Sequence, residues 1–250
     1  MINDILVALA DKYERKEFLD GDPSWFMHQV DGDSRELLAF IASSLSYGSR
    51  KQFLPKIQLI FDFSNGDVRE WLVSRRFETD IPSTDECYYR LFTCRMMNDF
   101  LRALAVMVDE YGSIKSYVSR TISPSRDCKD AVRAITEWFR EHGSVGIIPK
   151  DCTSSCKRVC MFMRWMTREG SPVDLGVWSD IIDASSLIIP MDTHVVQEAN
   201  RLGLITSRST SMSSAIRLTN RLKEIFPNDP VKGDYALFGL GVDSEADAIL

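Results

Sequence analysis

The chain has 250 residues, of which 44% are apolar and 26% charged, and these fractions are those of a folded globular domain. Such a composition excludes a disordered chain, and the lack of any long apolar run excludes a bilayer-spanning helix. The N-terminus carries an acid early and lacks the basic-then-apolar order of a signal peptide. We therefore expect a soluble protein of the cytoplasm that does not bind membranes.

The net charge of −6 argues against a general nucleic-acid coat protein. Residues 150–224 differ, because ten Lys or Arg and eight Asp or Glu give them a net charge of +2, which leaves −8 for the rest. Within this segment, residues 199–223 hold five cations and no acid. Such a basic strip is compatible with binding a few phosphates, and equally with an ordinary solvated helix face.

Helical periodicity recurs along the chain and alternating strand patterns are nearly absent, which predicts an all-α protein. The segment 34–46 shows an apolar stripe and opens with Asp33 and Glu36, an N-cap pairing. No long or low-complexity linker interrupts the chain, so we expect a single domain over 1–250. Helices are expected at about 2–15, 34–46, 50–63, 67–75, 88–110, 127–141, 154–168, 193–202, 212–225 and 231–239.

The six cysteines do not have the spacing of a zinc ribbon or finger. Cys152, Cys156 and Cys160 recur at helical spacing and could hold a soft metal. This triplet coincides with the apolar stripe of a helix, so small buried thiols are the better interpretation. We expect neither a metal nor a cofactor.

The segment 150–168 contains a lysine in an unusual setting. The Thr and Ser residues at 153–155 are good helix starters and place Lys157 in the first helical turn. Helical spacing puts Arg164 and Arg168 on the same flank, beside an apolar stripe. Partial burial, a helix N-terminus and nearby cations all lower the pKa of a lysine, and a neutral lysine is a nucleophile. A solvated surface lysine is the plainer interpretation.

The segment 187–204 leads an apolar run through Pro190 into a helix. Asp192 or Thr193 is the expected N-cap, and Val195 faces inward. Asp192 can be a cap and nothing more. An aspartate held at this place can also stabilise positive charge on a sugar or orient a water.

The stretch from Pro190 to Val195, followed by Arg201 to Leu204, resembles the aspartate loop of the helix-hairpin-helix DNA glycosylases, such as endonuclease III and the 8-oxoguanine glycosylases. The catalytic aspartate of that loop corresponds to Asp192. The stretch from Lys157 to Arg164 is similar to the lysine helix of the archaeal-type 8-oxoguanine glycosylases. In bifunctional members this lysine attacks the sugar C1′ and forms a Schiff base, and it corresponds to Lys157.

The whole chain is similar to an uncharacterised bacterial family placed in this glycosylase superfamily. This resemblance implies a two-lobed helical glycosylase architecture, and it carries no established activity. The matching motifs are Cys156 to Arg158, Met163 to Met166, Val173 to Trp178, Pro190 to Val195, Asp229 to Lys232 and Leu237 to Gly241.

Three features differ from the pattern of the active enzymes. Their hairpin usually has a Gly-x-Gly turn whose N–H groups bind phosphate, whereas residues 148–155 contain no glycine. Residues Val173 to Ser186 lengthen the connection between the two motifs relative to endonuclease III. No cysteine follows Cys160, so the iron–sulfur cluster of endonuclease III is not expected.

The resemblance implies a DNA glycosylase and abasic-site lyase that acts on a damaged base flipped out of DNA. Lys157 and Asp192 are the catalytic candidates. Tyr47 and Trp165 are candidates to stack on the base, although core packing suits both aromatic residues better. His194 could contact phosphate or simply cap its helix. The candidate contacts to nucleic acid are Arg158, Arg164, His194, Arg201 and Arg208.

A second hypothesis keeps the fold without the chemistry. In this case the chain is a module that binds nucleic acid or a partner protein, which would account for the missing glycine turn and the acidic composition. The two hypotheses differ at Lys157, because a lysine that binds phosphate tolerates substitution by arginine and a Schiff-base lysine does not.

Overall fold

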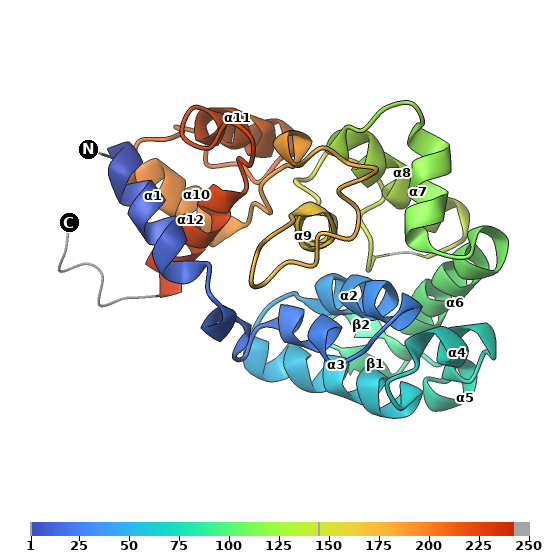
Figure 1. Cartoon of the computed structure of the whole chain (residues 1–250). Coiled ribbons are helices and arrows are strands. Elements are labelled where there is room, and N and C mark those ends of the chain that lie inside the picture. Colours follow the sequence, from blue (N-terminus) through green and yellow to red (C-terminus); the bar gives the residue numbers. More distant parts are fainter. Residues whose placement is uncertain (1, 145, 243–250) are drawn as a thin grey trace. The chain divides into compact units, whose positions relative to one another are not determined.

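The computed structural model of the chain describes residues 2–144 and 146–242, and this part is mostly helical (Figure 1). The expected all-α class is confirmed. Short 3-10 helices lie at Lys16–Leu19, Pro23–His28 and Ala184–Ser186, and two short strands are β1 (Cys87–Tyr89) and β2 (Phe92–Thr93). The α-helices are α1 (Ile2–Tyr13), α2 (Asp33–Leu45), α3 (Arg50–Ser64), α4 (Val68–Val73), α5 (Phe77–Asp80), α6 (Cys94–Tyr111), α7 (Ile114–Ile122), α8 (Cys128–Glu141), α9 (Lys157–Thr167), α10 (Thr193–Arg201), α11 (Met212–Lys223) and α12 (Lys232–Val242).

The chain forms two compact units, and each is built from separate stretches of sequence. Unit 1 contains the described residues up to Phe18, Arg126–Lys129 and those from Cys152 onward, and unit 2 contains Leu19–Ser125 and Asp130–Asp151. Because the chain passes more than once from one unit to the other, no single linker in the sequence separates the two units. A single domain over 1–250 stays a prediction. Within the described ranges, no helix has both the length and the hydropathy needed to cross a membrane.

In unit 2, helix α2 is buried on every side over its middle turns, which is wider than the single stripe expected. A helix that is apolar all round must be enclosed by other elements. Phe40 of α2 stacks on Phe100 of α6 and on Phe139 of α8, with ring centroids 5.9 and 5.3 Å apart. These rings tie three helices into one core.

The start of α2 differs from the sequence prediction. The helix begins at Asp33, and its N-cap is Gly32, which has no side chain to cap it. Glu36 instead accepts hydrogen bonds from the backbone N–H groups of Ile114 and Lys115, at 2.8 and 3.1 Å. These residues open α7, so the carboxylate of Glu36 meets the positive end of a neighbouring helix dipole.

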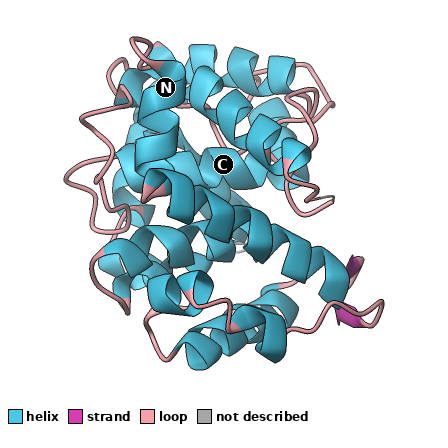
Figure 2. Cartoon of the chain, turned by 90° about the vertical axis from the view of Figure 1, so that its right-hand side faces the viewer, coloured by secondary structure: helices cyan, strands magenta, loops and turns pink. Residues whose placement is uncertain are grey.

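The N-terminal part of the expected helix 88–110 is a hairpin. Strand β1 pairs with β2 in antiparallel fashion (Figure 2), and α6 begins only at Cys94. Thr93 Oγ1 accepts a hydrogen bond from the N–H of Met96 at 3.2 Å and so caps α6. The aromatic residues of the hairpin at 88, 89 and 92 are buried. They therefore continue the apolar pattern of the helix in the sequence although they are not helical.

In unit 1, helix α9 is buried along nearly its whole length. Phe162 of α9 packs edge-to-face against Trp178, with ring centroids 5.1 Å apart. Trp178 comes from the connection Val173 to Ser186, so this insertion covers one side of α9. Helix α1 packs along α12, where a Cβ atom at Gly239 would lie 2.0 Å from the ring of Tyr13. Only glycine allows so close an approach.

Candidate functional site

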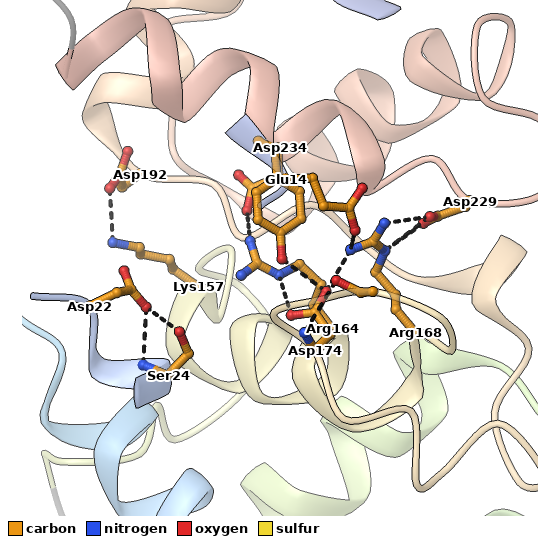
Figure 3. Close-up of polar contacts among 12 residues, drawn as sticks. Glu14, Asp22, Ser24, Lys157, Arg164, Arg168, Asp174, Asp192, Asp229 and Asp234 are labelled. Atoms are coloured by element: carbon orange, nitrogen blue, oxygen red, sulfur yellow. Dashed lines mark hydrogen bonds and ion pairs between the residues drawn. The ribbon is translucent and has the colours of Figure 1, made fainter. Parts of the chain in front are cut away.

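The two residues predicted to be catalytic lie side by side. Lys157 is the first residue of α9 and Asp192 immediately precedes α10. Lys157 Nζ lies 2.8 Å from Asp192 Oδ2, and the two side chains are 35% and 30% exposed (Figure 3). The pair therefore combines a close ion pair with access to solvent, and it lies where two helices begin. Helix N-termini favour anionic groups such as phosphate.

The residue before Lys157 has a strained backbone. Cys156 is the N-cap of α9 with φ of 48°, a left-handed conformation that residues other than glycine rarely adopt, and its side chain makes no capping bond. The conventional helix start predicted at 153–155 is therefore wrong. Ser155 Oγ instead donates a hydrogen bond to the carbonyl of Met191 at 2.8 Å. This bond ties the turn before Lys157 to the residue before Asp192, and such constraints hold strained turns in place.

Asp192, one of the two residues expected as the N-cap, caps α10, and its two oxygens have different partners. Oδ1 accepts a hydrogen bond from the N–H of Val195 at 2.9 Å, while Oδ2 faces Lys157. Burial raises the pKa of the Asp192 carboxyl, but the charge and hydrogen bond of Lys157, the Val195 N–H and the charge of His194 together hold it below its usual value. Asp192 is consequently a carboxylate at neutral pH.

Further along α9, the predicted cationic flank is buried. The side chain of Arg164 is only 5% exposed, and its guanidinium contacts Asp174 at 3.4 Å and also binds Asp234. Arg168 is equally buried and binds Asp174 as well. The ring centroid of Tyr235 lies 4.6 Å from Cζ of Arg164 and 5.3 Å from that of Arg168. Buried charges persist only when they are paired in this way.

Two further carboxylates complete this set, which we call the buried charge network (Figure 3). Arg168 contacts Glu14 and Asp229, each at 2.7 Å. Tyr235 donates its hydroxyl to Asp174 Oδ2 at 3.1 Å. The network therefore joins the C-terminal half of α9 to α12, to the residue that follows α1 and to the loop before α12, so it fixes where α9 and Lys157 lie within unit 1.

The buried charge network is electrostatically linked to the Lys157–Asp192 pair. Burial raises the pKa of Asp234 to about 6, although the adjacent Arg164 lowers it. The negative charge of Asp192 raises this pKa further, and the positive charge of Lys157 lowers it. A change in the charge of either Lys157 or Asp192 therefore shifts the pKa of Asp234.

Burial changes the roles predicted for two residues. Arg164 was expected to contact nucleic acid, but its guanidinium is enclosed by carboxylates and does not reach a phosphate outside. Trp165 was expected as a base-stacking candidate, but its side chain is fully buried and presents no ring face to a ligand. Both belong to the core of unit 1, because α9 is surrounded on the sides that carry them.

The other predicted contacts lie at or near the surface, and their roles stay predictions. Arg158 is half-buried in the first turn of α9, and His194, Arg201 and Arg208 are exposed. Arg201 pairs with Glu198 at 2.8 Å. Tyr47 belongs to unit 2, where it is 40% exposed.

Of the cysteine triplet, Cys156 and Cys160 are buried thiols as expected, whereas Cys152 is only half-buried because it lies in the loop before α9. Cys128 of unit 1 is also buried. Burial raises the pKa of Cys128 to about 12 and that of Cys160 well above its usual value. Within residues 2–144 and 146–242, no three His, Cys, Asp or Glu side chains are arranged to hold a metal ion.

A pocket of about 250 Å³ opens beside Arg168, between the end of α9 and the connection that follows it. Its lining includes Thr167, Ser179, Asp183 and Asp229. Lys157 begins α9 and Thr167 ends it, so about 15 Å of helix separates this pocket from the lysine. The pocket is therefore not part of the Lys157–Asp192 site.

The partners of Arg164 and Arg168 were not identified from the sequence. Asp174 and Asp229 lie within motifs of the family resemblance, but no role was attached to them. One signal was present, because two arginines on the flank of an otherwise apolar helix need carboxylates if that helix is buried. The sequence does not indicate which of its 36 Asp and Glu residues supply these carboxylates.

No curated protein and no solved structure matches this chain. Residues 22–243 match the family described as "Protein of unknown function (DUF2400)". The match covers most of the 250 residues, including Lys157, Asp192 and all of the buried charge network except Glu14. The chain belongs to this family.

Proposed function

We propose that the protein is a DNA glycosylase with abasic-site lyase activity, in which Lys157 is the nucleophile and Asp192 the charge-stabilising carboxylate. The observation that carries the proposal is the 2.8 Å contact between Lys157 Nζ and Asp192 Oδ2 at the starts of two helices. The resemblance of both segments to the helix-hairpin-helix glycosylases supplies the reaction class.

The first step needs a neutral amine. Lys157 gives up one proton, which Asp192 Oδ2 or a water beside it passes on to the departing base, so that Asp192 is again a carboxylate. As the bond between C1′ and the damaged base breaks, its electron pair leaves with the base and positive charge grows on the sugar. The carboxylate of Asp192 stabilises that charge, because it is already ionised and fixed by its bond to Val195.

The Lys157 amine then bonds to C1′. The sugar ring opens when the C1′–O4′ bond breaks and O4′ takes a proton, which leaves a protonated Schiff base between Lys157 and C1′. This imine acidifies C2′–H, so loss of that proton expels the 3′ phosphate and cleaves the strand. Water finally hydrolyses the imine and restores the amine.

Borohydride trapping tests the proposal, because hydride reduces the imine to a stable amine. The full chain is incubated with single-stranded and duplex oligonucleotides that contain 8-oxoguanine, uracil, an alkylated base or an abasic site. Borohydride is added, and covalent adducts are resolved on a denaturing gel. We expect an adduct with at least one substrate, and its peptide map should place the label on Lys157.

Lys157→Arg is the informative variant, because it keeps the positive charge opposite Asp192 but removes the nucleophilic amine. Lys232→Arg is the matched control, since Lys232 also opens a helix, is 32% exposed and pairs with Asp11 at 2.8 Å. Loss of the adduct in Lys157→Arg and its retention in Lys232→Arg would support the lyase. No adduct with any substrate, from folded wild-type protein, would refute the Schiff-base mechanism and leave the binding module as the better account.

A further inference from the structure

The tip of the β1–β2 hairpin in unit 2 presents an apolar side chain to solvent. Leu91 lies between the two strands and is 75% exposed, the largest exposed fraction among the large apolar residues of the described chain. A single exposed leucine is common on protein surfaces. This one differs because an ordered aromatic and cationic pair lies next to it in the fold.

That pair consists of Tyr47, which follows α2, and Arg90, which precedes Leu91. The guanidinium Cζ of Arg90 lies 4.9 Å from the centroid of the Tyr47 ring. Tyr89 donates its hydroxyl to the carbonyl of Tyr47, and the Tyr47 ring lies 6.2 Å from that of Phe92. We call Tyr47, Arg90 and Leu91 the hairpin surface.

The backbone conformations of Arg90 and of Gly48, which follows Tyr47, allow the guanidinium to approach the ring closely. Arg90 itself has φ of 52°, a conformation that side chains other than glycine rarely adopt. Gly48 has φ of 87°, and a Cβ atom there would lie 2.2 Å from Nη1 of Arg90. Strain of this kind persists where the surrounding structure imposes it, and it holds Arg90 over the ring in advance of any ligand.

Arg90 gives the hairpin surface a positive charge. The acids that precede the hairpin are Asp85 and Glu86, and Asp85 pairs with Arg95 at 2.9 Å. Lys56 of α3 adds a cation at the side of the hairpin, with its Nζ 5.0 Å from the ring centroid of Tyr88.

We propose that the hairpin surface binds a nucleic-acid strand at an unpaired base, with Leu91 against a base face and Arg90, held over the Tyr47 ring, at the adjacent phosphate. Every base has an apolar face that stacks on aromatic or apolar side chains, and a guanidinium matches phosphate geometry. The proposal rests on the proposed function for the identity of the strand as DNA. It adds Leu91 and Arg90 to the contacts expected from the sequence, of which Tyr47 also lies in unit 2.

The test is equilibrium binding of the full chain to fluorescent oligonucleotides, measured by anisotropy over a range of salt concentrations. The probes are one undamaged sequence as single-stranded DNA, as perfect duplex and as single-stranded RNA. Leu91→Ala and Arg90→Ala are the variants. Val73→Ala is the matched control, because Val73 lies in the same unit, is 42% exposed and is outside the hairpin surface.

We expect Leu91→Ala to weaken binding of single-stranded DNA by about fivefold or more, as removal of a stacking partner does. We expect Arg90→Ala to weaken it similarly and to flatten its salt dependence, because one phosphate contact is lost. Val73→Ala should bind as wild type does. The loss should be smaller on perfect duplex, whose bases are already stacked.

Unchanged binding of single-stranded DNA by both variants would overturn the proposal, as would an equal loss in Val73→Ala. A loss confined to RNA would overturn the assignment to DNA. Borohydride trapping at a saturating concentration of abasic single strand keeps the two proposals separate. Both hairpin variants should still form the adduct there, because Lys157 is intact. An absent wild-type adduct would refute the lyase, but the binding measurements would still test the hairpin surface independently.

Discussion

Replacement of Arg164 by methionine tests whether the buried charge network holds unit 1 together. Methionine has a similar length and fills most of the space, so the main change is the loss of one buried positive charge. Asp174 and Asp234 both lose a partner, and their side chains are 0% and 8% exposed. Removal of one partner from a buried ion pair costs about 3–5 kcal/mol, since the remaining charge is left uncompensated.

The structure places the expected loss near the lower end of this range. Asp174 keeps Arg168 as a partner, and Asp234 has a pKa already raised to about 6, so it can take up a proton instead of remaining an unpaired anion. We therefore expect a loss of about 3 kcal/mol in the free energy of unfolding at neutral pH. For a chain of this size that corresponds to a decrease in Tm of about 6–12 °C.

Urea unfolding followed by far-UV circular dichroism measures this loss. Arg201→Met is the matched control, because Arg201 pairs with Glu198 at 2.8 Å on the surface, where a salt bridge contributes less than about 1 kcal/mol. The argument would be refuted if Arg164→Met lost no more stability than Arg201→Met. Partial recovery in the double variant Arg164→Met with Asp234→Asn would show that the unpaired carboxylate is the cause.

Three further predictions follow from the site and the core. Asp192→Asn should retain the helix cap, because asparagine caps a helix as well as aspartate does. The same variant should reduce the rate of borohydride-trapped adduct formation by about 10²-fold or more. An unaltered rate would remove Asp192 from the mechanism. Asp234 binds a proton more tightly in the folded chain, with a pKa of about 6, than in the unfolded chain, with a pKa near 3.8. Its contribution to stability is therefore lost as pH rises from about 4 to about 6, by about 3 kcal/mol, and Asp234→Asn should flatten the unfolding free energy across that window. A thiol reagent should label the exposed Cys87 rapidly in the native chain and the buried Cys128 and Cys160 only on unfolding, and mass spectrometry that finds fast labelling of Cys160 would contradict its burial.

The sequence determined the helical class and most of the helices, because their apolar periodicity survives in any packing that buries one side. It also located both catalytic candidates. Asp192 at the start of α10 followed from its own residue type and the helix after it, and Lys157 was placed in the first turn of α9. These are local properties, set by neighbours within one or two turns.

Properties that depend on distant residues did not follow from the pattern. Residues 87–93 form a hairpin because tertiary packing buries their aromatic side chains, although the same residues continue the apolar pattern of a helix. Glu36 caps α7 and not its own helix, and nothing within one turn of it indicates so distant a partner.

Arg164 shows the difference most clearly. Its helical spacing from Lys157 puts both residues on one flank of α9, and this pattern predicts a cationic flank that contacts nucleic acid. Only the tertiary structure brings Asp174 and Asp234 to that flank and encloses it, which converts a surface cation into part of the core. A helical pattern gives the direction in which a side chain points from its own axis, but burial is decided by what the rest of the chain places there.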